Sequence, residues 1–228
     1  MQAGIEMTHP ISVVGNSKPG YWQWDKQVLL AVACVYSVFY RLFPEYTVPN
    51  LAPIGALALF SGFLLPRFFC WIPPIAVMAT SDVVLYFWKG YTPFNLTVYA
   101  LFCFYALAGS TLAGNLTRQS WFSRVICSSL TFFLLTNGGQ FITSSYVPSE
   151  YPGTWAVELS TSQYTYPLVQ YSRDLPGLMT CYLYALPFLA RTLVGDLVFS
   201  GLLFGLLVAI EKGYAPGRLL VEADASNS

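Results

Sequence analysis

The chain has 228 residues, of which 55% are hydrophobic and only 10% are charged, and its mean hydropathy is +0.54. Soluble domains carry about 25% charged residues, so this composition excludes an ordinary soluble domain. The formal net charge is zero, which indicates no basic surface for nucleic acid and no strongly charged partner. Apolar runs recur along almost the whole length, a pattern typical of a polytopic helical membrane protein.

The use of histidine and cysteine argues against a metal site or a catalytic triad. The single histidine, His9, lies in the polar N-terminal segment, so no apolar run offers an imidazole ligand or base. The five cysteines are scattered through apolar runs without a Cys-x-x-Cys pair, and we interpret them as small buried hydrophobic residues. We therefore expect no cofactor, no metal and no catalytic residue. Because the sequence has no nucleotide-binding loop, any ATP-driven step is expected to come from a partner.

The first part of the chain predicts a polar tail followed by five membrane spans. Residues 1–25 are polar and lack the apolar core of a cleavable signal peptide. Small residues in the second span would allow close helix packing. In the third span, Pro73 and Pro74 stand in the first turns, where proline is tolerated. We predict a single transmembrane domain over residues 26–212, whose first five spans are 26–43, 51–65, 69–88, 94–113 and 121–142.

The segment before the last span differs in composition. Residues 143–174 are rich in Ser, Thr, Pro and Tyr, so we predict a long outer loop lined by aromatic residues, including Trp155. Residues 175–190 are apolar but short, and they contain Pro187. We favour a helix that lies along the membrane surface or re-enters it, and the alternative is a seventh span. The last span is predicted at residues 191–210, and residues 213–228 form a polar C-terminal tail.

The predicted fold is therefore all-α, with six transmembrane helices and a long outer loop before the last one. Lysine and arginine residues divide unequally between the two sides of these spans. One side would hold seven of the eleven and the other would hold four. The positive-inside rule then places both termini in the cytoplasm.

Asp82 is the strongest candidate for a functional residue. An ionisable group inside a span costs roughly 2.5–3.5 kcal/mol on insertion scales, so it needs a reason to be there. By helical rise, Asp82 would lie roughly 9 Å below the outer surface. We expect five polar residues from four spans to share this depth, namely Asn50, Asp82, Asn137, Arg191 and Asp196. We predict from this a polar, ligand-binding pocket that opens outward and that the loop with Trp155 can cover.

The same residues also allow a purely structural interpretation. Asp82 and Arg191 could neutralise each other and hold two helices in register without touching a ligand. The amide of Asn137 could likewise form an interhelical hydrogen bond.

Several motifs resemble a known group of proteins. They are the run from Pro49 to Gly62, Ser81-Asp82, Leu134-Leu135-Thr136-Asn137, and the segment that contains Ala185-Leu186-Pro187-Phe188, Thr192-Leu193 and Gly195-Asp196. Over about residues 28–210 the chain resembles an uncharacterised family of bacterial integral membrane proteins. That family in turn resembles the substrate-binding S components of energy-coupling-factor (ECF) vitamin transporters.

The resemblance implies a six-helix protein of the bacterial inner membrane. S components bind a vitamin or metal from outside, under a loop between the fifth and sixth helices. They pass it to an energising module of one transmembrane subunit and two ATPases. The resemblance also implies that Asn50, Asp82, Asn137, Arg191 and Asp196 lie near the pocket. One departure concerns docking on that module: S components tend to carry an Ala-x-x-x-Ala motif in the first helix, and this chain has Ala33-x-x-x-Ser37.

Two functions follow as hypotheses. The first is a solute-binding component of a transporter, which binds a small, vitamin-like molecule from the outer face and relies on partner subunits for energy. The alternative is a non-catalytic structural or lipid-binding subunit of a larger membrane complex. An intramembrane enzyme is disfavoured because Ser81 and Asp82 are sequence neighbours and point to different faces of a helix. A channel is disfavoured because no repeated ring of charges is visible.

Overall fold

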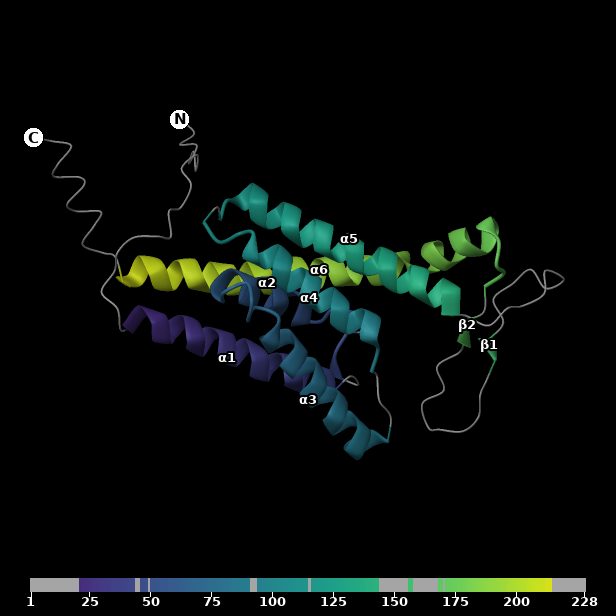
Figure 1. The fold of residues 1–228 in the computed structure, drawn as a ribbon, viewed down its shortest axis with the longest axis horizontal. Coiled ribbons are helices and arrows are strands. Elements are labelled where there is room, and N and C mark those ends of the chain that lie inside the picture. The colour runs from purple at the N-terminus through teal and green to yellow at the C-terminus, as the bar shows by residue number, and fades with distance from the viewer. Residues whose placement is uncertain are drawn as a thin grey trace, which may run out of the picture.

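The computed structural model describes residues 21–43, 46–48, 50–90, 94–114, 116–143, 156–157, 168–169 and 171–214. Within them the chain forms six α-helices and one pair of two-residue strands (Figure 1). The helices are α1 (Tyr21–Leu42), α2 (Ile54–Leu64), α3 (Ile72–Lys89), α4 (Leu96–Ser110), α5 (Arg118–Thr143) and α6 (Leu175–Tyr214). Strand β1 (Ala156–Val157) pairs antiparallel with β2 (Leu168–Val169), with Ala156 opposite Val169. The predicted all-helical class is confirmed.

The helices run back and forth along one bundle. In Figure 1, α1 begins and α6 ends at the same end, while β1 and β2 lie at the other. Lys26 near the start of α1 and Glu211 near the end of α6 form an ion pair with an N–O distance of 3.6 Å. Because successive helices reverse direction, the C-terminal half of α1 lies at the same end of the bundle as the C-terminal half of α3.

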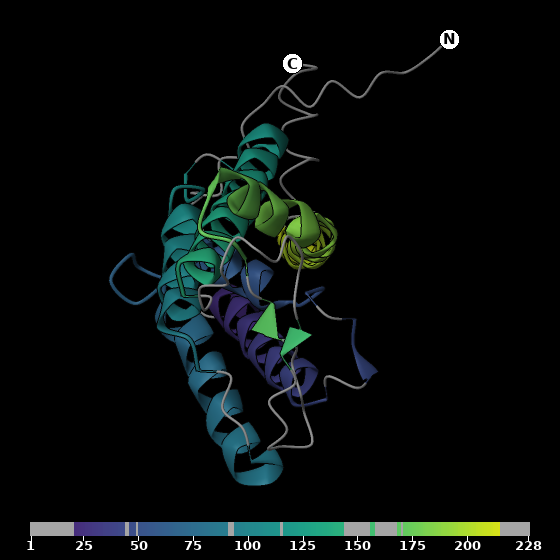
Figure 2. The ribbon, with the colours of Figure 1, turned by 90° about the vertical axis from the view of Figure 1, so that its right-hand side faces the viewer.

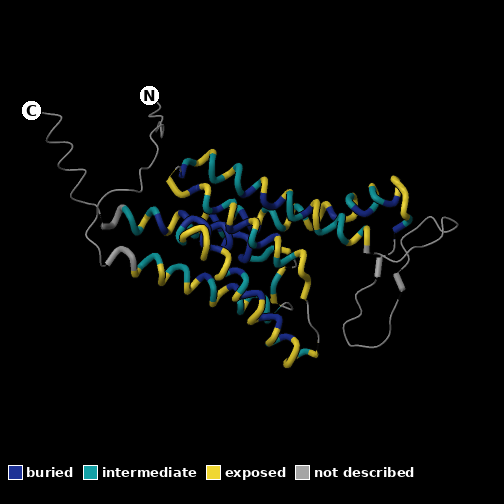
Figure 3. Tube along the Cα trace, viewed as in Figure 1, coloured by how far each residue is buried: buried dark blue, intermediate teal, exposed yellow. Residues whose placement is uncertain are grey.

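Helix α2 is the centre of the bundle. Ten of its eleven residues are buried, and Figure 3 shows this buried stretch in the middle of the molecule. Two glycines let α2 and α4 approach until their backbones touch: a Cβ on Gly62 would lie 1.9 Å from the Ala106 carbonyl oxygen, and one on Gly109 would lie 2.0 Å from that of Leu59. Inside a membrane, close packing of this kind drives helix association in place of hydrophobic burial.

The ends of α3 and the start of α4 follow from local sequence. Proline occupies the first turn of α3, where its missing N–H has no helical partner in any case. The helix ends at Gly90, whose φ of 72° lies in the left-handed region that glycine adopts without strain. Asn95 caps α4, because its side chain accepts hydrogen bonds from the backbone N–H groups of Thr97 and Val98.

The structure joins the two segments that were predicted separately at residues 175–190 and 191–210. Both segments belong to one continuous helix, α6, which has 40 residues and contains Pro187. Proline removes one hydrogen bond and clashes with the preceding turn, so it can bend a helix without ending it. Figure 2 shows the part of α6 before this region pointing in a different direction from the part that follows it.

The helices differ in whether they are long and apolar enough to cross a membrane. Two of the described helical segments, Arg118–Ile142 and Leu175–Glu211, are both long and apolar enough to cross a membrane. Ile54–Leu64 and Leu96–Ser110 are apolar but shorter. At 1.5 Å per residue α6 is about 60 Å long, roughly twice the thickness of the hydrocarbon core.

Candidate functional site

A polar cluster joins α1, α3 and α4. Arg41, in the last turn of α1, donates from Nη2 to Oδ1 of Asp82 at 2.5 Å. Tyr99 of α4 donates its hydroxyl to the other carboxylate oxygen, Oδ2, at 2.8 Å. Asp82 is therefore bound on both oxygens, and it is only 5% exposed. We call Arg41, Ser81, Asp82 and Tyr99 the Arg41 cluster.

Ser81 fixes the other edge of the guanidinium group. Nε of Arg41 donates to the Ser81 hydroxyl oxygen at 2.6 Å. The same hydroxyl lies 2.8 Å and 2.9 Å from the backbone carbonyls of Val77 and Met78. A hydroxyl has one proton and two lone pairs, so Ser81 accepts from Arg41 while it donates to its own helix. The result is an arginine held at a defined position by α3.

Within the described part of the chain, Arg41 keeps hydrogen-bonding capacity after these contacts. A guanidinium group carries five N–H donors, and the bonds to Ser81 and Asp82 use two of them. The Arg41 side chain is 19% exposed, against 6% for that of Asp82. A fixed, partly exposed guanidinium group with free donors is suited to bind a carboxylate or a similar acceptor.

The predicted pairing of Asp82 with Arg191 is wrong, because Arg41 occupies that role. Helix α3 packs on α1, α2 and α4, so α6 does not bring Arg191 to Asp82. Arg191 is exposed, and within the described part of the chain no hydrogen bond or ion pair is formed by its side chain. The sequence did carry a signal for Arg41: it is the basic residue in the last turn of α1, at the end of the bundle where α3 also ends.

A second polar cluster surrounds Asp196 of α6. Its Oδ2 accepts hydrogen bonds from the Tyr105 hydroxyl of α4 at 2.8 Å and from the Ser129 hydroxyl of α5 at 2.7 Å. Its Oδ1 lies against the first turn of α2, where a Cβ on Gly55 would come within 2.2 Å of it. Asp196 is 2% exposed, so it links four helices from inside the bundle. Neither Tyr105 nor Ser129 was predicted as part of a site.

The two clusters lie at different levels of the bundle. Tyr99 and Tyr105 are on the same helix, and six residues of helical rise separate them by about 9 Å. Asp82 and Asp196, which they bind, are therefore not neighbours.

The other predicted site residues stay apart from both clusters. The amide of Asn137 donates to the Phe133 carbonyl of its own helix at 2.8 Å, and it forms no interhelical bond with another described residue. Asn50 is exposed in the turn before α2, with a φ of 65°. Trp155 lies outside the described residues, as does most of the predicted outer loop.

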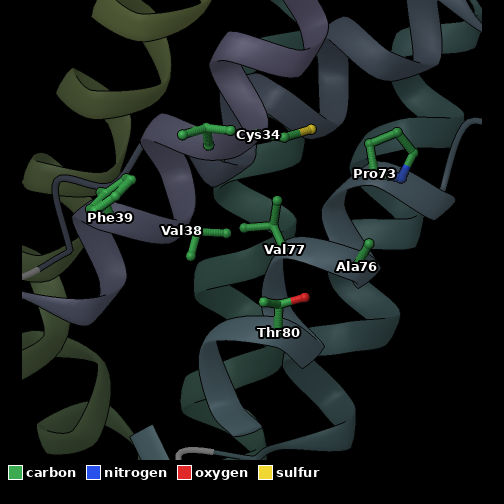
Figure 4. Close-up of a pocket in the computed structure, with 8 residues that line it drawn as sticks. Cys34, Val38, Phe39, Pro73, Ala76, Val77 and Thr80 are labelled. Carbon is green, nitrogen blue, oxygen red and sulfur yellow. The ribbon is translucent and has the colours of Figure 1, made fainter. Parts of the chain in front are cut away.

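An apolar groove lies between α1 and α3 (Figure 4). It has a volume of about 380 Å³ and opens on the side of the bundle. The residues that line it are Cys34, Val35, Val38 and Phe39 of α1, and Pro73, Ala76, Val77 and Thr80 of α3. The sequence predicted a pocket lined by the embedded polar residues, and this groove contains none of them.

Among the described residues, no group of three or more His, Cys, Asp or Glu side chains could hold a metal ion. All five cysteines are free thiols. In the Arg41 cluster, the donors without a described partner belong to Arg41, whose guanidinium group binds anions and carbonyl groups.

Comparison with known proteins identifies a family but no close relative. No curated protein and no solved structure matches the chain significantly. The model of a family described as "Family of unknown function (DUF6580)" matches residues 23–218, which is most of the chain. The chain therefore belongs to the DUF6580 family.

Proposed function

We propose that this protein is a multi-pass component of a bacterial inner membrane that binds a small molecule and works with partner subunits. All six helices would lie in the membrane, with both termini in the cytoplasm and β1 and β2 on the outer side. The ligand would enter from that outer side, as in the S components that the sequence resembles. Energy would come from a separate transmembrane and ATPase module or from another membrane complex, and the chain itself would carry no catalytic residue.

The outward face of α1 supports the membrane part of this proposal. Val28, Val32, Val35 and Phe39 recur at helical spacing along one side, and all four are exposed. A helix on the surface of a soluble protein turns its apolar stripe inward. An exposed stripe of this length is expected where the surrounding solvent is lipid.

The observation that carries the binding proposal is the set of hydrogen bonds formed by Arg41. Asp82 and Ser81 hold its guanidinium group at 2.5 Å and 2.6 Å and leave part of it exposed, and no other described residue bonds to its remaining three N–H donors. A buried ion pair with a purely structural role would satisfy both partners, because an unpaired buried donor is costly. Among the described residues, Asp82 has a partner on each carboxylate oxygen, whereas Arg41 has partners on only two of its five N–H donors, which supports a ligand that supplies acceptors.

The residues of this chain that correspond to the docking motif of S components are buried, so they do not offer a surface to a partner subunit. Ala33 and Ser37, the closest counterparts of that motif, are 8% and 1% exposed. The Ser37 hydroxyl also donates to the Ala33 carbonyl within the helix. An energising module would therefore have to contact another surface of this chain.

Native mass spectrometry of gently purified protein tests the proposal. Wild-type protein should carry a small molecule, and a variant that combines Arg41→Gln with Asp82→Asn should lose it. Both charges are removed together so that neither is left buried alone. Arg124→Gln is the matched control, because Arg124 is an arginine that bonds to Thr111 and Ser123 away from the cluster. A small molecule retained by the double variant would contradict the proposal.

One observation favours the alternative, a structural or lipid-binding subunit. Asp196 is almost completely buried and is bound by Tyr105 and Ser129, so this carboxylate serves to join helices. In that case the same mass spectra would show bound lipid or stoichiometric protein subunits, and no small solute would be lost in the double variant.

A further inference from the structure

The helix faces that form the groove between α1 and α3 continue toward the Arg41 cluster, although no residue of the cluster lines the groove itself. On α1 the lining residues Cys34 and Val38 are followed by Arg41, and on α3 Val77 is followed by Ser81. Residues three or four apart lie on the same face of a helix. The two stripes that form the walls of the groove therefore end in Arg41 and Ser81, which are bonded to each other. Figure 4 shows the apolar part of this path, with Val38 and Val77 facing each other across it.

The groove is lined by apolar side chains, and the cluster beyond its end carries polar groups. Six of the eight lining residues have purely hydrocarbon side chains, and Cys34 and Thr80 add only a thiol and one hydroxyl. From Cys34 to Arg41 the path is about 10 Å long by helical rise. An apolar channel with hydrogen-bond donors at one end is complementary to a molecule with an aliphatic tail and a polar head.

The charges in the cluster select the head group. The donors of Arg41 that have no described partner suit an acceptor, and a planar carboxylate can accept two parallel N–H bonds from one guanidinium edge. The Asp82 carboxylate is bonded to the same guanidinium group, so a head group with two negative charges would be repelled more strongly than one with a single charge. A monoanionic carboxylate fits better than a phosphate monoester.

We propose that the groove binds an aliphatic carboxylate, with the tail between α1 and α3 and the head group on the free N–H groups of Arg41. This inference rests on the proposed function and gives it a ligand class. The tail would lie next to the lipid, because the groove opens on the side of the bundle, and the head group would reach Arg41 at the outer end of α1.

Calorimetric titration of the full chain in lipid nanodiscs, with empty nanodiscs as the blank, tests this inference. The probes are dodecanoate, acetate, which has the head without the tail, and dodecan-1-ol, which has the tail without the charge. Dodecanoate should bind about tenfold or more tightly than either of the others, because only it uses both the groove and Arg41. The double variant Arg41→Gln, Asp82→Asn should weaken dodecanoate binding about tenfold or more and leave dodecan-1-ol unchanged.

A variant that fills the groove tests the position of the tail. Ala76 lines the groove and is exposed, so Ala76→Phe can place a ring in it without disturbing the core. Ala79 is exposed on the same helix but does not line the groove, and Ala79→Phe is the matched control. Ala76→Phe should weaken dodecanoate binding about tenfold, while Ala79→Phe should leave it within about twofold of wild type. Val35→Phe, from the opposite wall, replaces Ala76→Phe if that variant does not fold.

Three results would overturn the inference. If Ala76→Phe and Val35→Phe bind dodecanoate like wild type while the double variant does not, the tail lies elsewhere and the solute-binding function stands. If acetate binds as tightly as dodecanoate, the ligand has no tail in the groove, and again only this inference fails. If no probe binds, the ligand class is wrong, and the co-purification experiment separately decides whether Arg41 binds another solute.

Discussion

The hydroxyl of Tyr105 in α4 donates to the carboxylate of Asp196 in α6 over 2.8 Å, although 91 residues separate the two in sequence. Both residues are almost completely buried, and Ser129 of α5 donates to the same oxygen. A carboxylate at this position would be very costly without such donors. This pair therefore holds α4 and α6 together around α2.

Replacing Tyr105 by phenylalanine should destabilise the protein. The substitution removes one of two donors to Asp196 and keeps the packing of the ring, so the expected loss is about 0.5–2 kcal/mol. Thermal or denaturant unfolding in a defined detergent would measure it. Tyr182→Phe is the matched control, because the Tyr182 hydroxyl donates to the Leu134 carbonyl in an exposed setting and should matter less. Equal losses in the two variants would contradict a special role for the Tyr105–Asp196 bond.

Gly55→Ala should be more disruptive than its small volume suggests. The new methyl carbon would lie 2.2 Å from Oδ1 of Asp196 and 3.0 Å from the Tyr105 ring, so the carboxylate would have to leave its donors. Overpacking of this kind costs about 1–3 kcal/mol. Gly205→Ala provides the comparison, since its methyl group would meet nothing within 4 Å. Gly205→Ala should be neutral or more stable by up to about 1 kcal/mol. If Gly55→Ala were equally stable, the Asp196 carboxylate would have room for a methyl group at position 55, and this prediction would be wrong.

Features encoded in neighbouring residues were predictable from the sequence. Apolar runs predicted the first five helices in order, Pro73 and Pro74 predicted the first turn of α3, and small residues predicted the close packing of the second span. Each of these depends on local backbone preferences or on periodicity, and a single sequence contains that information. Pro187 marks the limit of such signals, because proline can either end a helix or bend it, and here α6 continues through it.

The partners of the buried carboxylates were not predictable in the same way. Depth along the membrane can be counted from residue numbers, but the position of a helix around the bundle axis cannot. Arg191 was chosen for Asp82 by depth, whereas Arg41 is the partner because α1 packs on α3. Tyr105 and Ser129 carry no distinctive sequence signal, since a tyrosine or serine in an apolar run is common in membrane helices. Knowing which helices are neighbours would have supplied all of these contacts.

Asp174 should make the start of α6 sensitive to acid. Its carboxylate accepts hydrogen bonds from the Ser172 hydroxyl and the Gly177 N–H at 2.7 Å and 2.8 Å, and these bonds lower the pKa of Asp174 below its usual value. A group whose folded-state pKa is lowered stabilises the fold above its unfolded pKa, about 3.9, and that contribution is lost as the pH falls through the folded value.

Hydrogen exchange at the amides of residues 177–179 would measure this effect. Exchange relative to the intrinsic rate should rise as the pH falls below about 4. Asp174→Asn keeps a capping side chain that cannot titrate, so the pH dependence should disappear while the helix start stays protected at neutral pH. An unchanged pH profile in this variant would assign the acid sensitivity to another group.

The proposed topology places both termini on the cytoplasmic side. The start of α1 and the end of α6 lie at one end of the bundle, and Lys26 and Glu211 form an ion pair there, so any orientation must put them on the same side. The excess of lysine and arginine at that end favours the cytoplasm. A reporter that is active only in the cytoplasm should therefore work after residue 228 and fail when it is inserted after residue 150. Activity at both sites would mean that α6 does not cross the membrane, and activity only after residue 150 would reverse the orientation and move the Arg41 cluster to the inner face.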